Sequence, residues 1–112
     1  MQTPHDSLVV CCNCPDETSA HLLAQGIITA RLAACVNQMA AVKSSYHWHG
    51  KIEQMTEVPL MIKTTVAAYP QLEQWLLEHH PYEVPEIIAL PIIAGAASYL
   101  DWIAKEVNLD QK

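Results

Sequence analysis

The order in which strand-like and helix-like patterns follow one another most constrains how this chain can fold. Four stretches rich in apolar and β-branched residues predict strands, at Ser7–Cys14, Cys35–Gly50, Val58–Val66 and Glu86–Ile93. Three stretches carry apolar residues at helical spacing and predict helices, from an N-cap at Asp16 to about Leu32, over Tyr69–His80, and after Gly95. The predicted order is therefore strand, helix, strand, strand, helix, strand, followed by a C-terminal helix.

This order predicts an α+β fold of the ferredoxin-like type. Two strand–helix–strand halves with right-handed crossovers, joined by a hairpin, give a split sandwich with an antiparallel sheet. Its central strands would be the first and the third, which suits the apolar character of Ser7–Cys14 and Val58–Val66. Because 112 residues is the length of one compact domain, we expect a single domain over residues 1–112, with residues 1–7 as a flexible N-terminus.

The second predicted strand is too long for the sheet of one subunit. Its 16 residues, 35–50, would span about 50 Å, whereas the first helix covers only about half of that length. We expect a bend near Met39–Ala41 and a reversal at Gly50-Lys51. The overhanging arm carries Tyr46 and Trp48, which need another surface to bury against. The pattern predicts a homo-oligomer built by strand arms, and it leaves the number of subunits open.

Composition excludes several classes of protein. Hydrophobic residues make up 51% of the chain and charged residues 16%, which excludes an intrinsically disordered protein. The 6 basic and 12 acidic residues give a net charge of −6, which argues against a nucleic-acid or anionic-membrane partner. Three glycines cannot build a glycine-rich phosphate loop. The polar start at Met1–Ser7 and the absence of a long apolar stretch predict a cytoplasmic protein without a signal peptide or membrane span.

Three cysteines lie within one tetrapeptide of the first predicted strand. Cys12 and Cys14 share one face of that strand, and Cys11 points to the other face. Thiolates are soft ligands that suit Cu(I) or Zn(II). The alternative is that these residues are small apolar side chains in a buried strand, because free cysteine is among the most buried residue types.

Two adjacent histidines end the second predicted helix. Adjacent helical residues point about 100° apart, whereas histidine pairs that bind a metal on a helix are normally four residues apart. His79 and His80 could therefore lie with one ring on the core face and the other in solvent. Combination with Cys12 strengthens a metal-binding interpretation. No cysteine, serine or histidine stands in a context typical of a nucleophile, so we expect no enzymatic activity.

Several strings of the chain resemble the CutA family of divalent-cation tolerance proteins. They follow the order and spacing of that family from Leu8 to Val107, and they read VVCCNCPDE, RLAACVN, YHWHGKIEQ, KTT, HHPYEVPEI and YLDWI. The resemblance implies a ferredoxin-like subunit assembled as a homotrimer, in which strand arms join neighbouring sheets. It also implies a cytosolic protein linked to tolerance of copper and other divalent metals, without catalytic activity.

The resemblance also implies candidate site residues. A copper ion, with zinc as a further candidate, would be held by Cys12, His79 and His80. This chain adds Cys11 and Cys14, so which cysteine holds the metal stays open. A candidate cleft between subunits would be lined by Tyr46, Trp48, Lys51, Glu57 and Lys63. The alternative function is a trimeric scaffold or small-molecule sensor that uses such clefts and no physiological metal.

Overall fold

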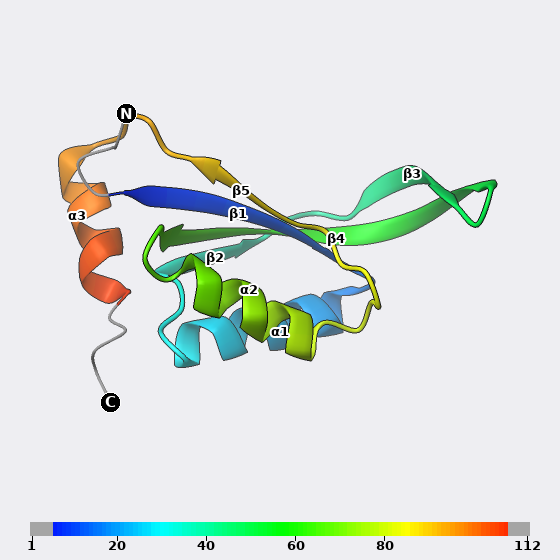
Figure 1. The fold of residues 1–112 in the computed structure, drawn as a ribbon, viewed down its shortest axis with the longest axis horizontal. Helices are drawn as coiled ribbons and strands as arrows, with labels where there is room; N and C mark the ends of the chain where they lie inside the picture. The colour runs from blue at the N-terminus through cyan, green and yellow to red at the C-terminus, as the bar shows by residue number, and fades with distance from the viewer. Residues whose placement is uncertain (1–5, 108–112) are drawn as a thin grey trace.

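A computed structural model of the chain describes residues 6–107. The strands are β1 (Ser7–Cys14), β2 (Cys35–Gln38), β3 (Val42–Trp48), β4 (Lys51–Thr65) and β5 (Ile87–Pro91). The helices are α1 (Glu17–Thr29), α2 (Tyr69–His79) and α3 (Ala97–Glu106). Helices α1 and α2 lie side by side on one face of the sheet, and α3 lies at its end (Figure 1). The predicted flexible terminus, residues 1–7, falls mostly outside the described residues, and Ser7 already belongs to β1.

The sheet confirms the predicted ferredoxin-like α+β fold. Its strand order is β2-β4-β1-β5, and β3 pairs with β4 beyond this path. The two central strands are therefore β1 and β4, as the apolar runs predict. All pairings are antiparallel, with Cys12 opposite Leu60 of β4 and opposite Ile87 of β5.

Helix α1 begins at the predicted cap but ends three residues before the predicted Leu32. The carboxylate of Asp16 accepts a hydrogen bond of 2.7 Å from the backbone N–H of Ser19, which satisfies one unpaired donor of the first turn. Arg31 adopts a left-handed backbone with φ 57°. The N–H of Leu32 then bonds to the carbonyl of Ile27, so the helix closes in a Schellman-type turn.

The long second strand is interrupted where the sequence predicts a bend. Residues 39–41 separate β2 from β3, and β3 then pairs with the first half of β4 to form an arm that extends beyond the sheet (Figure 1). Two residues with positive φ, His49 at 51° and Gly50 at 78°, reverse the chain in the geometry of a type I′ hairpin. The return strand β4 is longer than the predicted Val58–Val66, because the arm pairing adds residues from Lys51 onward.

The core lies between the sheet and helices α1 and α2. Fully buried side chains come from every layer, among them Val10, Ile27, Leu60, Ile62 and Leu76. A smaller cluster packs α3 against the end of the sheet through Leu100 and Ile103. None of the helices within residues 6–107 is long and apolar enough to cross a membrane.

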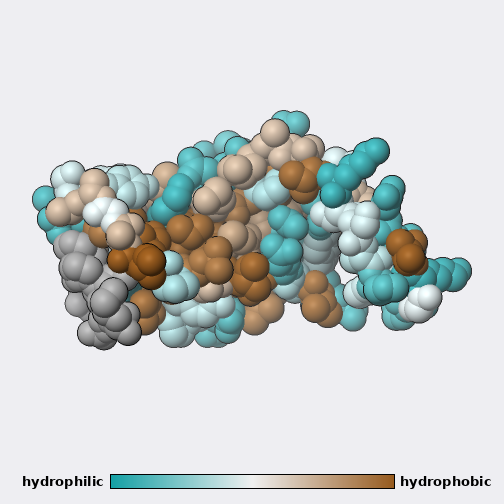
Figure 2. Space-filling model, turned by 90° about the horizontal axis from the view of Figure 1, so that it is seen from above, coloured by the Kyte–Doolittle hydropathy of each residue, from teal (hydrophilic) through white to brown (hydrophobic). Residues whose placement is uncertain are grey.

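The opposite face of the sheet has no helix over it. Because paired residues of antiparallel strands share a face, the register places Cys11 with Met61 and Ile88, and Val9 with Leu90, on this uncovered face. Ile88 and Leu90 are 51% and 53% exposed. Figure 2, viewed from the side away from α1 and α2, shows hydrophobic side chains gathered over the middle of the molecule. This apolar surface is large for one isolated subunit.

Candidate functional site

Two thiols and one imidazole meet where β1 ends and α2 ends. One ligand atom each of Cys12, Cys14 and His80 lies within 4.8 Å of the others. Both cysteines are fully buried, and His80 is only 8% exposed. The two thiols come together because they are two residues apart on one strand and point to the same face. Residues 6–107 contain no other group of three cysteine, histidine or carboxylate side chains as close.

The imidazole of His80 is held by two backbone groups. Its Nδ1 accepts a hydrogen bond of 3.0 Å from the N–H of Tyr82, so its Nε2 carries the proton and donates to the carbonyl of Asn13 at 2.8 Å. Burial lowers the pKa of His80, although the bond to Asn13 and the nearby Glu57 act in the opposite direction. The ring is therefore neutral at pH 7, which is the state that binds a metal.

The two thiols differ in how readily they lose a proton. A hydrogen bond between their side chains lowers the pKa of Cys14, and the same bond together with burial raises the pKa of Cys12. The first thiolate of the pair therefore forms at Cys14. Two sulfurs and one imidazole nitrogen fit a soft ion such as Cu(I), or Zn(II), and they do not fit Mg²⁺ or Ca²⁺.

The structure brings together only part of the ligand set that the resemblance implies. Cys12 and His80 lie in the buried group, whereas His79 is exposed and stacks on Trp75 with ring centroids 4.1 Å apart. The Nδ1 of His79 lies 2.7 Å from the carbonyl oxygen of Trp75. Helix α2 ends at His79, and His80 continues with an extended backbone that turns its ring toward β1. Cys11 lies on the opposite face of β1 from the group.

The lowered pKa of His80 predicts a pH-dependent share of the stability of the metal-free protein. The unfolded chain takes up a proton at His80 below about pH 6.5, whereas the folded chain resists it. The unfolding free energy should therefore fall as the pH is lowered from about 6.5 through the folded-state pKa. Urea unfolding with a chelator present should show a steeper loss in the wild type than in His80→Asn. Equal slopes in the two proteins would contradict this assignment.

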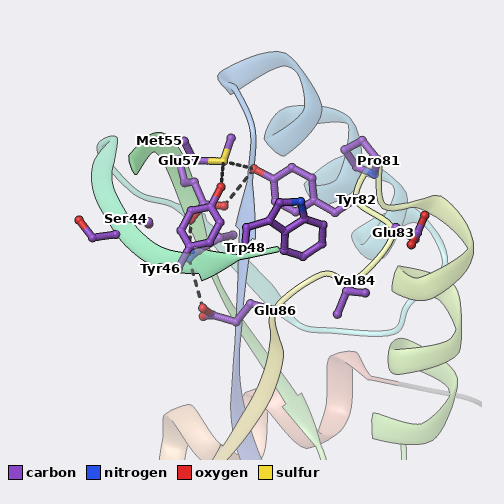
Figure 3. A pocket seen from close by; sticks show the side chains of 12 residues that line it. Ser44, Tyr46, Trp48, Met55, Glu57, Pro81, Tyr82, Glu83, Val84 and Glu86 are labelled. Atoms are coloured by element: carbon purple, nitrogen blue, oxygen red, sulfur yellow. Dashed lines mark hydrogen bonds between the residues drawn. The ribbon is translucent and has the colours of Figure 1, made fainter. Parts of the chain in front are cut away.

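A pocket lies beside this group, between the arm and the segment Pro81–Glu86. Its volume is about 620 Å³. Tyr46 and Trp48 of β3 form one wall, Met55 and Glu57 of β4 form another, and Tyr82 closes the side toward α2 (Figure 3). Three of the five predicted cleft residues therefore line this pocket.

The other two predicted cleft residues lie elsewhere in the chain. Lys51 is at the far end of the arm, and Lys63 is hydrogen-bonded to Asn37 of β2. Sequence reasoning missed Tyr82 and Glu86, which also line the pocket. Both belong to the string HHPYEVPEI, and only the folded chain shows that this loop faces the arm.

A polar network crosses the floor of the pocket. The Tyr82 hydroxyl donates to Glu57 at 2.9 Å, and burial together with this bond raises the pKa of Tyr82. The side-chain amide of Asn13 lies 3.4 Å from Glu57 and 3.3 Å from Glu86. Figure 3 shows the pocket side chains converging from the arm, from β4 and from the loop after α2. The backbone of Asn13 and of Tyr82 also forms hydrogen bonds with His80, so the pocket and the thiol–imidazole group have these two residues in common.

The fold and the buried donor group define a small ferredoxin-like protein with a thiol–imidazole group suited to a soft metal ion. Comparison with protein families matches residues 8–106 to the CutA1 divalent ion tolerance protein family. The chain belongs to this family, as its motifs predict. It is 42% identical over 97 residues to the divalent-cation tolerance protein CutA of Escherichia coli K12 / DH10B, which covers 87% of both chains. Both descriptions name tolerance of divalent ions.

Solved structures agree with this family. The divalent cation tolerance protein of Thermus thermophilus superposes with a TM-score of 0.89 and 40% identity over 91% of this chain and 99% of its own. CutA1 of the psychrotrophic bacterium Shewanella gives a TM-score of 0.89 and 42% identity over 95% and 97%. A relative from Archaeoglobus fulgidus, described as periplasmic, gives 0.88 and 32% identity over 91% and 99%.

Proposed function

We propose that this protein binds copper as a homotrimer in the cytoplasm and thereby contributes to tolerance of divalent metals. The observation that carries the proposal is the buried group of Cys12, Cys14 and His80, whose ligand atoms lie within 4.8 Å. A buried soft-donor set gives copper preference over Mg²⁺ and Ca²⁺, and zinc is the further candidate. Binding through both sulfurs displaces the thiol protons of Cys12 and Cys14, and the hydrogen bond with Cys12 lowers the pKa of Cys14.

The ligand set in this proposal differs in one member from the set that the resemblance implies. Cys12 and His80 are common to both, and Cys14 takes the third position because it lies in the same buried group. His79 would join only if the end of α2 unwound and its ring left Trp75. The chain itself supplies a preformed pair of sulfurs on a rigid strand, so a metal has little ordering to impose on these two ligands.

The uncovered face and the arm support the trimeric part of the proposal. Ile88 and Leu90 on the face, and Ile52 on the arm, are large apolar side chains that are between 51% and 75% exposed in one chain. Strands β2 and β5 also leave two sheet edges unpaired within residues 6–107. Neighbouring copies that lay their arms across these faces would bury this surface. The number three comes from the resemblance to the family.

The proposal predicts that the purified protein binds Cu(I) at one ion per chain and that Cys12→Ala loses this binding. Removing one of the two soft sulfur donors should lower the affinity by more than the roughly 10- to 100-fold that loss of a group hydrogen-bonded to a ligand costs. Competition against a chromophoric Cu(I) chelator measures the change. Cys35→Ala is the matched control, because Cys35 lies on β2 outside the buried group. Unchanged binding in Cys12→Ala would overturn the ligand assignment.

The same variant tests the role in tolerance. A strain that lacks this protein should be more sensitive to copper, and expression of the wild type should restore growth. Cys12→Ala, expressed at the same level, should fail to restore it. Full rescue by Cys12→Ala would separate tolerance from metal binding at this group.

One observation favours the second candidate function, a trimeric scaffold or small-molecule sensor without a physiological metal. The pocket of about 620 Å³ beside the arm is within the usual range of small-molecule sites, about 300–1,000 Å³. It has aromatic walls and a buried carboxylate, which are the features that fix the orientation of a ligand. The side chains that form these walls indicate the chemical class of such a ligand.

A further inference from the structure

Glu57 presents a carboxylate to the pocket from a buried position. The residue is 8% exposed, and its oxygens accept hydrogen bonds from the neutral hydroxyl of Tyr82 and the neutral amide of Asn13. Within residues 6–107, no lysine, arginine or histidine side chain forms an ion pair with it. A buried carboxylate without a countercharge is costly, so this position favours a cation that approaches from the pocket.

The other charged residues of the pocket lining are also acidic, and the lining adds aromatic faces. Glu83 and Glu86 border the pocket, and its described lining contains no lysine, arginine or histidine. An anionic ligand would therefore meet three carboxylates and no cationic side chain in this lining. In one chain, Trp48 and Tyr46 are 47% and 37% exposed, and both line the pocket. Aromatic faces attract organic cations, and a bound cation that is partly removed from water gains more from them.

The arrangement does not suit a metal ion. The amide nitrogen of Asn13 lies between the carboxylates of Glu57 and Glu86 and donates to both, so these two groups already converge on an N–H donor. Neither carboxylate belongs to a group of three potential metal ligands within residues 6–107. The sulfur of Met55 accepts a hydrogen bond of 3.1 Å from Tyr46, which adds a soft apolar wall.

We propose that this pocket binds an organic ammonium ion with an apolar or aromatic body. The ammonium group would lie against Glu57 and Glu86, and the body would pack against Trp48, Tyr46 and Tyr82 (Figure 3). This inference rests on the second candidate function and names its ligand class. It does not depend on metal binding at Cys12, Cys14 and His80.

A charge series measured on the native oligomer tests this ligand class. Calorimetric titration with 2-phenylethylammonium, 2-phenylethanol and 3-phenylpropanoate compares a cation, a neutral molecule and an anion with the same aromatic body. The cation should bind at least about 10-fold more tightly than the neutral compound, which is the range expected for one hydrogen bond to a charged group. The anion should show no binding. A chelator in the buffer excludes any contribution from metal.

Matched variants locate the binding. Glu57→Gln keeps the shape and an acceptor for Tyr82, and it should lower affinity for the cation at least about 10-fold. Glu53→Gln is the control, because Glu53 lies on the same strand, is exposed and does not line the pocket. Three outcomes would each overturn the proposal. They are an affinity that does not depend on ligand charge, an equal loss of affinity in both variants, and no binding because a neighbouring subunit fills the pocket. Copper binding by Glu57→Gln, measured separately, distinguishes this failure from failure of the metal proposal.

Discussion

Cys14→Ala is expected to lower the affinity for Cu(I) by at least about 100-fold, as much as Cys12→Ala. The physical reason is that Cys14 supplies one of the two soft sulfur donors of the buried group, and its hydrogen bond with Cys12 lowers its pKa. Loss of a donor should exceed the roughly 10- to 100-fold that loss of a ligand's hydrogen-bonding partner costs. Competition with a chromophoric Cu(I) chelator measures the affinity. Urea unfolding without metal checks that the small alanine side chain leaves the fold intact.

His79→Ala is the decisive comparison for this prediction. Its exposed ring is stacked on Trp75 and lies outside the buried group, so its removal should change the affinity by less than about 3-fold. Cys35→Ala controls for the loss of a thiol as such. If His79→Ala weakened binding strongly and Cys14→Ala left it unchanged, the ligands would be Cys12, His79 and His80, and the end of α2 would have to unwind on loading.

Metal loading at His80 requires a local rearrangement, because both ring nitrogens are already bonded. A metal at Nδ1 displaces the N–H of Tyr82. A metal at Nε2 replaces the proton on that nitrogen and breaks the hydrogen bond to the carbonyl of Asn13. The remaining ring proton is then on Nδ1, where it faces the N–H of Tyr82. In either case the backbone at Tyr82 must shift, and the hydroxyl of the same residue holds Glu57. The two candidate sites are therefore mechanically linked through Tyr82 and Asn13.

The sequence could predict the order of elements because each element follows from a local pattern. The N-cap at Asp16, the bend between β2 and β3, and the reversal at Gly50 depend on neighbouring residues only. The ends of elements were less predictable. Helix α1 stops early because Arg31 takes a left-handed conformation, for which arginine gives no signal of the kind that glycine gives. Strand β4 starts early because its pairing with β3 stabilises it.

The candidate site was only partly predictable because it depends on contacts between distant residues. The shared face of Cys12 and Cys14 follows from strand alternation. The approach of His80 does not, since its ring bonds to the carbonyl of Asn13, 67 residues away in the chain. The angle of about 100° between adjacent helical residues does not apply to His79 and His80. His80 lies beyond the last helical residue and has an extended backbone. Which histidine turns inward is thus decided by where α2 ends.

The second large effect is expected at the uncovered face of the sheet. Ile88→Lys combined with Leu90→Lys should convert the native oligomer into single chains. Both side chains lie on the face opposite α1 and α2, and each is about half exposed in one chain, so the charges cost the folded subunit little. In an assembly that buries this face, two ammonium groups would lose water without gaining partners. The subunit affinity should fall by at least about 100-fold, and sedimentation velocity at micromolar concentration measures the change.

Leu77→Lys is the matched control, because Leu77 is 56% exposed on the outer surface of α2, across the sheet from this face. It introduces one ammonium group in place of an exposed leucine, as Leu90→Lys does, and it should leave the assembly unchanged. The thermal midpoint should fall in the double variant only, because the native oligomer is stabilised by the association of its subunits. Persistence of the oligomer in Ile88→Lys/Leu90→Lys would mean that the arm alone holds it together. A different binding partner would then be needed to cover the exposed apolar side chains of β5.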